Sequence, residues 1–420
     1  MFYKFAYLKN AMKRIFALGV ASLCCLFIIA QEKSLSVTVK NNWDEPKKDE
    51  PVVIKFKILK DWKNLSMKVK SVIVWDGDKE IPSQLDDLNR DGVNDELAFV
   101  IDVPSKSSKT LRISLSSKTT TTVYPARVHA QMKLSDKNKK NPEIQYLSVP
   151  GGTPDADIYS AIYGHGPCFE SELTAFRIYF DNRQSIDLYG KIKRQLELAE
   201  TNFYTPKEQR DKGYGCDVLW AGKSVSLGSF RGWENNEPSY INKVALRSEG
   251  ILAYGPVRTV IEVADKDWEY NGKKLNMIQR YILYAGHRDV EVNIHFEEAD
   301  VKNNTFCTGV MKLETENKGF IQKDGLAGSW GKNIPEKGEP DNVETVGLGV
   351  YIPQVYVSKT LEDSNNYLIL LNTNGKKSLK YNLTFCAAKE EQGFKDSKSW
   401  FEYLNQWKNQ LQHICSISIK

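Results

Sequence analysis

Apolar and polar residues alternate along most of this chain, and this pattern predicts short β-strands. Between residues 31 and 118 the strand-like stretches are LSVTVKN, PVVIKFKI, MKVKSVIVWDG, ELAFVIDVP and TLRISLS, and turn residues separate them. This region is therefore predicted to be a small β-sandwich of roughly immunoglobulin size. Residues 119–143 are polar and include a run of threonines, which predicts a linker.

Strand patterns resume at Tyr146, so residues 144–420 are predicted to form a second, larger antiparallel β domain. The chain closes with one predicted helix, in which Ser399 and Glu402 have the spacing of a capping box. The apolar stripe of that helix is expected to pack on a sheet and consists of Trp400, Leu404, Trp407 and Leu411. The predicted fold class is all-β, with a small N-terminal sandwich, a large antiparallel β domain and one C-terminal helix.

The segment from Tyr163 to Lys191 carries more reactive side chains than a structural strand face needs. His165 stands between two glycines, which allow positive φ and close approach of a ligand. In the strand that follows, Arg177 alternates with apolar neighbours and so lies on the polar face. Histidine and tyrosine often transfer protons, which favours a catalytic site, although an exposed face of an antiparallel sheet is also polar. The candidate catalytic residues are His165, Tyr163 and Tyr189, and the candidate substrate-binding residues here are Arg177, Arg183, Lys191 and Glu172.

Three later residues complete the candidate substrate-binding set. Arg258 shares a strand face with Glu262, and His295 shares one with two glutamates, although solvated sheet faces would show the same pattern. The Gly- and Pro-rich stretch from Gly325 to Gly349 is predicted to be a long loop. In that loop Trp330 is expected to stack on a sugar face.

An acidic loop inside the first sandwich resembles a calcium-binding loop in its spacing. Its oxygen donors and a glycine at the sharp turn suit a structural calcium ion, but position twelve is Ala98 instead of glutamate and no helices flank the loop. The alternative is a turn held by its own Asp and Asn side chains. The candidate ligands are Asp87, Asn89, Asp91 and Asp95.

The N-terminus predicts export. Basic residues precede the apolar segment from Ile15 to Ala30, which is typical of a signal peptide over residues 1–30 and predicts a periplasmic protein. Residues 1–30 contain four basic residues and no acidic ones, so four of the five net positive charges lie there. The remainder of the chain carries about +1 and gives no electrostatic argument for nucleic acid. No later stretch is apolar enough to span a membrane.

Several classes of site are not supported by sequence motifs. GxGxxG, GxxxxGK[ST], GxSxG and HExxH are all absent, and the five histidines are scattered. The five cysteines after the signal segment show no CxxC and are expected to be mostly buried free thiols, with one disulfide left open. No cofactor is required for the chemistry considered below.

Five stretches together resemble a known family: YGHGPCFESE, RIYFDNRQSIDLYGK, KGYGCDVL, YGPVRTVIEV and QRY followed by GHRDVEV. The resemblance is to the Bacteroidota domain-of-unknown-function family 4861, found in polysaccharide-utilisation clusters, and it covers about Asn41 to Cys415. It implies a β-supersandwich similar to galactose-mutarotase-like and polysaccharide-lyase β domains. It also implies an oligosaccharide substrate rich in uronic acid. It transfers no catalytic residues.

Elimination on a uronic-acid oligosaccharide is the leading hypothesis, by a carbon–oxygen lyase of the polysaccharide-lyase or hydro-lyase type. It needs a base, an acid and a cation for the substrate carboxylate. His165 is the expected base, Tyr163 or Tyr189 the acid, and Arg177, Arg183 and Lys191 the cations. Two alternatives stay open. One is aldose 1-epimerisation by His295 with Glu291 or Glu297, and the other is a glycan-binding module without catalysis. Hydrolysis by Glu170 and Glu172 is disfavoured because neighbours on one strand face do not flank a bond.

Overall fold

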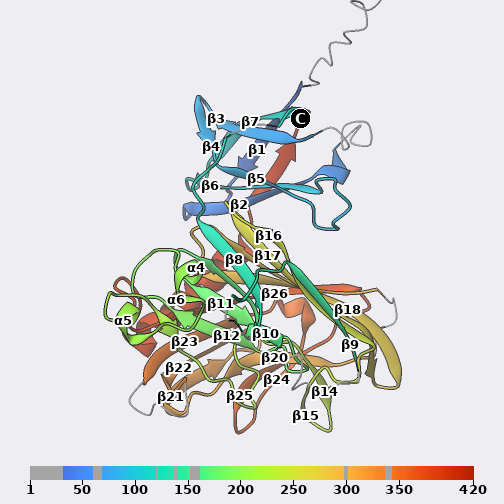
Figure 1. The fold of residues 1–420 in the computed structure, drawn as a ribbon, viewed down its shortest axis with the longest axis vertical. Helices are drawn as coiled ribbons and strands as arrows, with labels where there is room; N and C mark the ends of the chain where they lie inside the picture. Colours follow the sequence, from blue (N-terminus) through green and yellow to red (C-terminus); the bar gives the residue numbers. More distant parts are fainter. Residues whose placement is uncertain are drawn as a thin grey trace, which may run out of the picture.

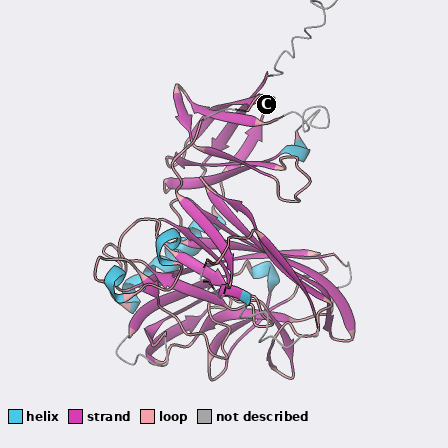
Figure 2. Cartoon of the chain, viewed as in Figure 1, coloured by secondary structure: helices cyan, strands magenta, loops and turns pink. Residues whose placement is uncertain are grey.

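A computed structural model of the chain describes residues 32–59, 69–119, 122–136, 138, 140–151, 161–297, 301–335 and 343–420. The predicted signal peptide lies outside the described residues. In Figure 1 a smaller β module sits above a larger one, and Figure 2 shows that strands make up most of both. The all-β prediction is confirmed.

Within the described residues the smaller module is a sandwich of two sheets. The five-stranded sheet has the order β27-β1-β7-β3-β4, and the three-stranded sheet has the order β2-β6-β5. Alternate residues of both sheets, such as Val37, Phe99 and Ile113, pack into one core between them. The strands are β1 Glu32–Lys40, β2 Lys47–Lys55, β3 Ser71–Asp76, β4 Lys79–Ile81, β5 Ser83–Asp86, β6 Glu96–Val103, β7 Ser108–Ser116 and β27 Ser416–Ile419, and the 3-10 turn η1 spans Phe56–Ile58.

The last strand of the chain belongs to the smaller module. β27 pairs antiparallel with β1, and Val37 lies opposite Ile419. The range predicted for the larger domain, 144–420, therefore includes a strand that pairs with the other module. The range predicted as a linker, 119–143, likewise includes a strand, β8 (Val128–Leu134), which pairs with β10 (Ile162–Ser171) of the larger module.

The larger module is a supersandwich in which a described nine-stranded sheet faces two five-stranded sheets. The nine-stranded sheet is ordered β21-β22-β23-β26-β19-β18-β17-β16-β9. Its strands are β9 Tyr146–Pro150, β16 Leu246–Tyr254, β17 Arg258–Tyr270, β18 Lys273–Tyr284, β19 Asp289–Phe296, β21 Thr315–Ile321, β22 Leu326–Asn333, β23 Glu344–Tyr351 and β26 Ser378–Ala387.

The two smaller sheets pack against it through one apolar core that includes Phe176, Tyr281 and Leu383. The first, ordered β13-β12-β11-β10-β8, carries the segment singled out by the sequence. Its further strands are β10 Ile162–Ser171, β11 Ala175–Ile178, β12 Ile186–Gly190 and β13 Cys216–Asp217. The second consists of β14 Arg231–Glu234, β15 Glu237–Ser239, β20 Phe306–Met311, β24 Val357–Glu362 and β25 Asn366–Leu371.

Among the described residues the helices lie outside the sheets. They are α4 Leu198–Thr201, α5 Lys207–Arg210 and α6 Ser397–Gln412, with a 3-10 turn η3 at Gln354–Tyr356. The predicted C-terminal helix is α6, but the predicted capping box is wrong. Its N-cap is Asp396, whose side chain accepts from the Ser399 backbone N–H. Within the described ranges no helix has both the length and the apolarity needed to cross a membrane.

Helix α6 packs on β22 and β23 at positions that are glycine. A Cβ at Gly349 would lie 2.3 Å from a Leu404 methyl, and one at Gly347 would lie 2.7 Å from the Trp400 indole. Glycine is therefore required for the helix to reach the sheet. The stretch from Gly325 to Gly349, predicted to be a loop, is thus two strands of the larger sheet, with residues 336–342 between them outside the described residues.

Candidate active site

Strands β10 to β12 place their polar residues on the outer face of the first five-stranded sheet. Phe176 and Ile178 point inward to the core, so Arg177 between them points outward. Arg177 lies directly across from Asp187 on β12. The strand period therefore brings a cation and an anion together on one face.

Arg177 is the centre of this face, although only 1% of it is exposed. Its guanidinium donates to the Tyr204 hydroxyl at 2.9 Å, to the Tyr179 hydroxyl at 3.0 Å and to the Asp187 carboxylate. A fourth acceptor, Asp217 Oδ2, lies 3.4 Å away. Burial alone would lower the pKa of Arg177, but the charge of Asp187 and the neighbouring oxygens raise it well above its usual value. Arg177 is therefore a fixed cation inside a ring of oxygens.

Tyr204 reaches Arg177 from the segment that follows α4. Asn202 and Phe203 both have positive φ, of 52° and 72°, and this sharp turn directs Tyr204 back over the sheet. Its side chain remains accessible, with 37% of the residue exposed. Burial raises the pKa of Tyr204, whereas the charge and hydrogen bond of Arg177 act in the opposite direction. Tyr204 is consequently a protonated phenol at neutral pH whose anion would be stabilised by a guanidinium.

His165 and Tyr163 lie beside this centre on an irregular part of β10. The pairing of β10 with β8 shifts register between Tyr163 and Cys168, and His165 has φ of 68°. A Cβ at Gly166 would lie 1.7 Å from the Ile178 carbonyl oxygen, so the bulge requires glycine there. The His165 ring stacks near Tyr179 at 6.0 Å between centroids, and the Tyr163 ring meets Tyr204 edge-on at 6.0 Å.

Arg183 completes the accessible part of the cluster. It lies in the β11–β12 connection with its guanidinium carbon 5.2 Å from the Tyr179 ring centroid. Two of its nitrogens contact Asp181, at 2.7 and 2.5 Å, and 35% of its side chain is exposed. The structure thus brings together four predicted residues: Tyr163, His165, Arg177 and Arg183.

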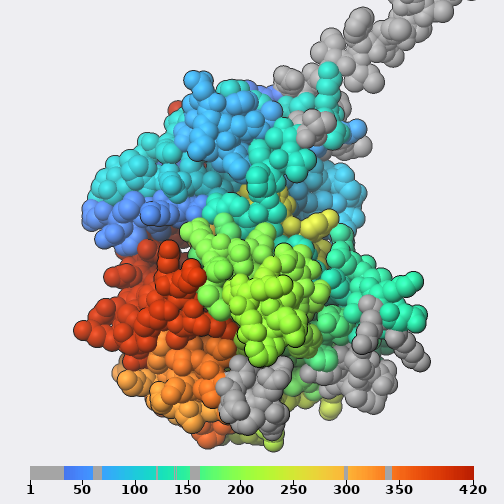
Figure 3. Space-filling view, turned by 60° about the vertical axis from the view of Figure 1, so that its left-hand side comes forward, coloured from blue at the N-terminus to red at the C-terminus, as the bar shows by residue number. Residues whose placement is uncertain are grey.

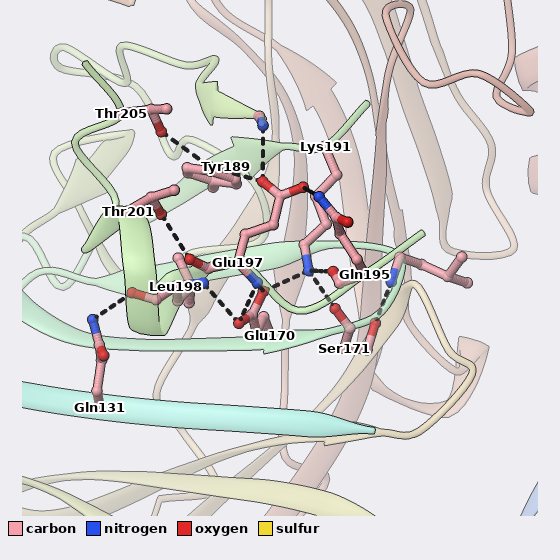
Figure 4. Close-up of polar contacts among 12 residues, drawn as sticks. Gln131, Glu170, Ser171, Tyr189, Lys191, Gln195, Glu197, Leu198, Thr201 and Thr205 are labelled. Atoms are coloured by element: carbon pink, nitrogen blue, oxygen red, sulfur yellow. Dashed lines mark hydrogen bonds and ion pairs between the residues drawn. The ribbon is translucent and has the colours of Figure 1, made fainter. Parts of the chain in front are cut away.

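Two predicted residues lie in a buried network next to this face (Figure 4). Lys191 Nζ donates to Glu170 Oε2 at 2.5 Å and to the carbonyls of Ser171 and Gln195 at 2.6 Å, which uses all three of its N–H bonds. The Tyr189 hydroxyl donates to Glu197 Oε2 at 2.9 Å, and burial raises the pKa of Tyr189. Neither residue is exposed, so the predicted roles in substrate contact and catalysis do not fit their positions.

The buried network instead holds the segment that carries Tyr204. Glu170 accepts the backbone N–H groups of Glu197 at 2.9 Å and Leu198 at 2.8 Å, at the start of α4. Leu198 and Phe203 pack with Tyr189 in a small apolar cluster on the same face. In Figure 3 the segment around residue 200 (green) lies on the surface beside the C-terminal part of the chain (red).

Glu172 and Arg258 lie between the two modules. Glu172 accepts from Arg127 Nε at 2.6 Å and from the Gly286 backbone N–H at 2.8 Å. Arg258, 1% exposed, donates to Asp86 at 2.7 Å and to Glu96 at 2.8 Å, both in the smaller module. The charge of Arg258 is matched by carboxylates of the smaller module, and the charge of Glu172 is matched by Arg127, which also binds Asp49 of the smaller module. These ion pairs correct the prediction of Glu172 and Arg258 as substrate ligands.

His295 and Trp330 also lie away from the cluster. His295 is on the exposed face of β19, where its Nδ1 pairs with the Ser378 hydroxyl at 2.7 Å. Trp330 is 7% exposed in β22 and packs in the apolar cluster beneath α6 with Trp400 and Leu404. The prediction of an exposed indole platform is wrong, because the helix covers that face of the sheet.

The acidic loop is closed by its own side chains. Asp87 Oδ2 accepts from the Gly92 backbone N–H at 2.8 Å, and Asp91 Oδ1 accepts from the Val93 N–H at 2.8 Å. Asn89 and Asp95 hold the rest of the loop through contacts of 2.9 Å and 2.7 Å to backbone N–H groups. Among the described residues no group of three or more His, Cys, Asp or Glu side chains is placed to hold a metal ion. The structural calcium ion predicted at Asp87, Asn89, Asp91 and Asp95 stays a prediction.

The remaining site residues differ in how well local sequence patterns predict them. Tyr179 and Asp187 could have been found, because the strand period that selects Arg177 places both beside it. Tyr204 and Asp217 lie outside that strand pair, and no local pattern connects them with Arg177. Their position depends on the turn after α4 and on the pairing of β13 with β12.

Comparisons with known proteins identify a family and two distant structures. A family profile described as "Domain of unknown function (DUF4861)" matches residues 39–417. No curated protein matches the chain. A glycosyl hydrolase family 38 protein from Enterococcus faecalis is similar over 92% of this chain and 47% of its own, at 10% identity and a TM-score of 0.46. An alpha-mannosidase from Enterococcus faecalis V583 is similar over 92% and 46%, at 11% identity and a TM-score of 0.42. The chain spans about half the length of these structures, and similarity at this level says nothing about its activity.

Proposed function

Because this chain belongs to the DUF4861 family, whose description names no activity, we propose its function from its own site. It is an exported enzyme that cleaves or dehydrates uronic-acid-containing oligosaccharides by β-elimination. One observation carries this proposal: the buried guanidinium of Arg177 is hydrogen bonded to two phenols, Tyr179 and Tyr204, and the His165 imidazole lies against one of them. Export rests on the pattern of residues 1–30.

β-Elimination needs three functions that this cluster can divide among its residues. A base removes the proton from C5 of the uronate, the bond from C4 to its oxygen substituent breaks as an acid protonates that oxygen, and a C4=C5 double bond remains. His165 is the base. Tyr204 is the acid, because burial keeps it protonated until the transfer and Arg177 then stabilises the phenolate.

The cation that meets the substrate carboxylate is Arg183 in this proposal. Arg177 was predicted for that role, but its charge is already matched by Asp187 and Asp217 beneath the surface. Arg183 binds the Asp181 carboxylate and remains partly exposed. A guanidinium in this position can share its N–H groups with a second carboxylate. Arg183→Ala is therefore expected to reduce the preference for uronate over neutral sugars.

The direct test is incubation of the full-length mature protein with a panel of uronic-acid oligosaccharides. Elimination creates a conjugated double bond that absorbs ultraviolet light, and mass spectrometry distinguishes chain cleavage from loss of water. Tyr204→Phe should lower kcat by about 10²-fold or more with KM nearly unchanged, since it removes one proton and no ring contact. His165→Gln should lower kcat to a similar degree.

Tyr254→Phe is the matched control. Tyr254 is 54% exposed at the end of β16, outside the cluster, and its variant should retain full activity. Full activity in Tyr204→Phe would overturn the assignment of the acid. Binding of the oligosaccharides without any change in absorbance or mass would identify a glycan-binding module instead of an enzyme.

A further inference from the structure

Cys216, Lys389 and Glu344 form a compact cluster that the proposed reaction does not use. Cys216 lies in β13, at the edge of the five-stranded sheet that carries the candidate site. Lys389 follows β26, and Glu344 begins β23, so both come from the nine-stranded sheet. Lys389 Nζ lies 2.8 Å from Cys216 Sγ and 2.8 Å from Glu344 Oε1, and Sγ lies 3.4 Å from the same Oε1.

The distance between the lysine nitrogen and the cysteine sulfur is short for a hydrogen bond. Nitrogen and oxygen in a hydrogen bond are typically about 2.9 Å apart, and sulfur is a larger atom than oxygen. Nζ nevertheless approaches Sγ as closely as it approaches the carboxylate oxygen. The separation is one that a single atom bonded to both could span.

Packing holds the lysine chain against the cysteine. A Cβ at Gly190 would lie 3.3 Å from Lys389 Cε and 2.7 Å from the Ala387 Cβ, so the absence of a side chain there lets the Lys389 chain pass. Cys216 is 6% exposed, while 20% of the Lys389 side chain is exposed. The sulfur is therefore buried, and the pair has partial solvent exposure on the side of the lysine.

The other described cysteines lack such a partner. All five are free of disulfides and buried. The Cys168 thiol donates to the Gly166 carbonyl at 3.8 Å and Cys307 to the Gly232 carbonyl at 3.4 Å. In the described part of the chain Cys216 alone is hydrogen bonded to a lysine, which makes the remaining thiols internal controls.

We propose that Cys216 and Lys389 are joined under oxidising conditions by a covalent bridge in which one oxygen atom links Sγ to Nζ. The oxidant is hydrogen peroxide. Lys389 first releases a proton, for which Glu344 at 2.8 Å is the acceptor. The S–H bond and one N–H bond then break, and S–O and O–N bonds form. Two peroxide molecules accept four electrons, and three waters leave. Sulfenic acid at Cys216 is the first intermediate.

The bridge ties two sheets together next to the candidate site. β13 also carries Asp217, which contacts Arg177, and its neighbour β12 carries Asp187. The bond therefore fixes the edge strand of the site-bearing sheet to the nine-stranded sheet. Burial raises the pKa of the Cys216 thiol to about 11, so little thiolate exists at neutral pH and the reaction is slow. The device suits a lasting response to oxidation more than a rapid catalytic cycle.

Peptide mapping by mass spectrometry tests the bridge in the wild-type protein. The full-length mature chain is treated with hydrogen peroxide, unfolded, alkylated and digested, with and without a thiol reductant. The expected product is one peptide pair joining Cys216 to Lys389, with a gain of one oxygen and loss of two hydrogens, about +14 mass units. A thiol reductant should abolish it.

The variants separate the bridge from ordinary thiol oxidation. Lys389→Arg keeps the positive charge and should stop the linked pair from forming, so that Cys216 carries only added oxygen. Cys216→Ser should abolish the product as well. The proposal is overturned if Cys216 of the peroxide-treated wild type is fully alkylated after unfolding. It is also overturned if Cys216 gains oxygen but is never found linked to Lys389.

Discussion

Raising the pH from 6.5 towards 9 should weaken the contact between the two modules at His287. This side chain follows β18 in the larger module, and its Nε2 lies 2.8 Å from the backbone carbonyl oxygen of Asp49 in the smaller one. Its Nδ1 lies 3.1 Å from Asp289 Oδ1. A carbonyl and a carboxylate can only accept hydrogen bonds, so both ring nitrogens must carry protons. The geometry therefore requires the charged imidazolium.

The expected size of the effect follows from the pKa. Burial alone would lower the pKa of His287, but the hydrogen bond and charge of Asp289 outweigh it and raise the pKa from 6.5 to about 9. The folded state thus holds a proton that the unfolded chain has released across this interval. The stabilisation is complete below pH 6.5 and is lost as the pH rises through 9. At about 1.4 kcal/mol per pH unit, the whole interval corresponds to roughly 3 kcal/mol.

Urea unfolding of the wild type and His287→Gln at both ends of this interval measures the effect. The wild type should be more stable than His287→Gln at pH 6.5, and this advantage in the free energy of unfolding should be smaller at pH 9 by up to about 3 kcal/mol. His295→Gln is the matched control, because its ring pairs with a Ser378 hydroxyl that can donate as well as accept. A wild-type advantage over His287→Gln that does not change with pH would refute the doubly protonated ring.

Four further outcomes follow from buried or looped residues. Trp330→Ala should cost about 3–5 kcal/mol in urea unfolding because it empties the cluster beneath α6, and its KM should stay unchanged; a raised KM without lost stability would return it to the site. Lys191→Met should cost about 3–5 kcal/mol by leaving Glu170 buried and unpaired, and wild-type stability would disprove this. Among the described residues neither carboxyl oxygen of buried Glu249 has a hydrogen-bond partner, and burial raises its pKa well above the usual value. Above the pH range in which ordinary carboxyl groups titrate, the free energy of unfolding of the wild type should therefore fall as the pH rises, whereas Glu249→Gln lacks this contribution. The difference in slope should be about 1.4 kcal/mol per pH unit, and parallel curves for the two proteins would contradict it. Asp91→Ala should lower the melting temperature, because it removes the hydrogen bond to the Val93 N–H, and should leave activity intact. A calcium-dependent shift of the melting temperature in the wild type alone would show that the loop binds the ion. Lost activity at normal stability would exclude a structural role.

The sequence predicts the strands in which apolar and polar side chains alternate. It does not predict the segments whose residue types are determined by tertiary contacts. β19 was evident because apolar residues alternate with polar ones along it, and the sheet buries one set. β22 and β23 were hidden by their glycines, which weaken a strand locally yet are required where α6 approaches. β8 falls in the range predicted to be a linker although its apolar and polar residues alternate, because polar residues dominate the region on both sides of it.

The candidate site was predicted in part for the same reason. Tyr163, His165 and Arg177 share a stretch of chain, so local spacing was enough to group them. Lys191 and Tyr189 looked like site residues, but their charges and hydroxyls are used up inside the protein by Glu170 and Glu197. Whether a polar side chain on a strand faces solvent or a covering segment depends on distant residues, and strand periodicity carries no information about those.

The pairing of β27 with β1 determines the order in which the two modules can finish folding during synthesis. β1 is synthesised before the larger module, whereas its partner strand at residues 416–419 is synthesised after that module. Until then one edge of β1 has unpaired backbone groups and could pair with a strand of another chain. The intervening larger module must fold, or at least emerge, before that edge closes. The smaller module should therefore become fully protected from amide hydrogen exchange only after the larger module, even though β1 is made before it.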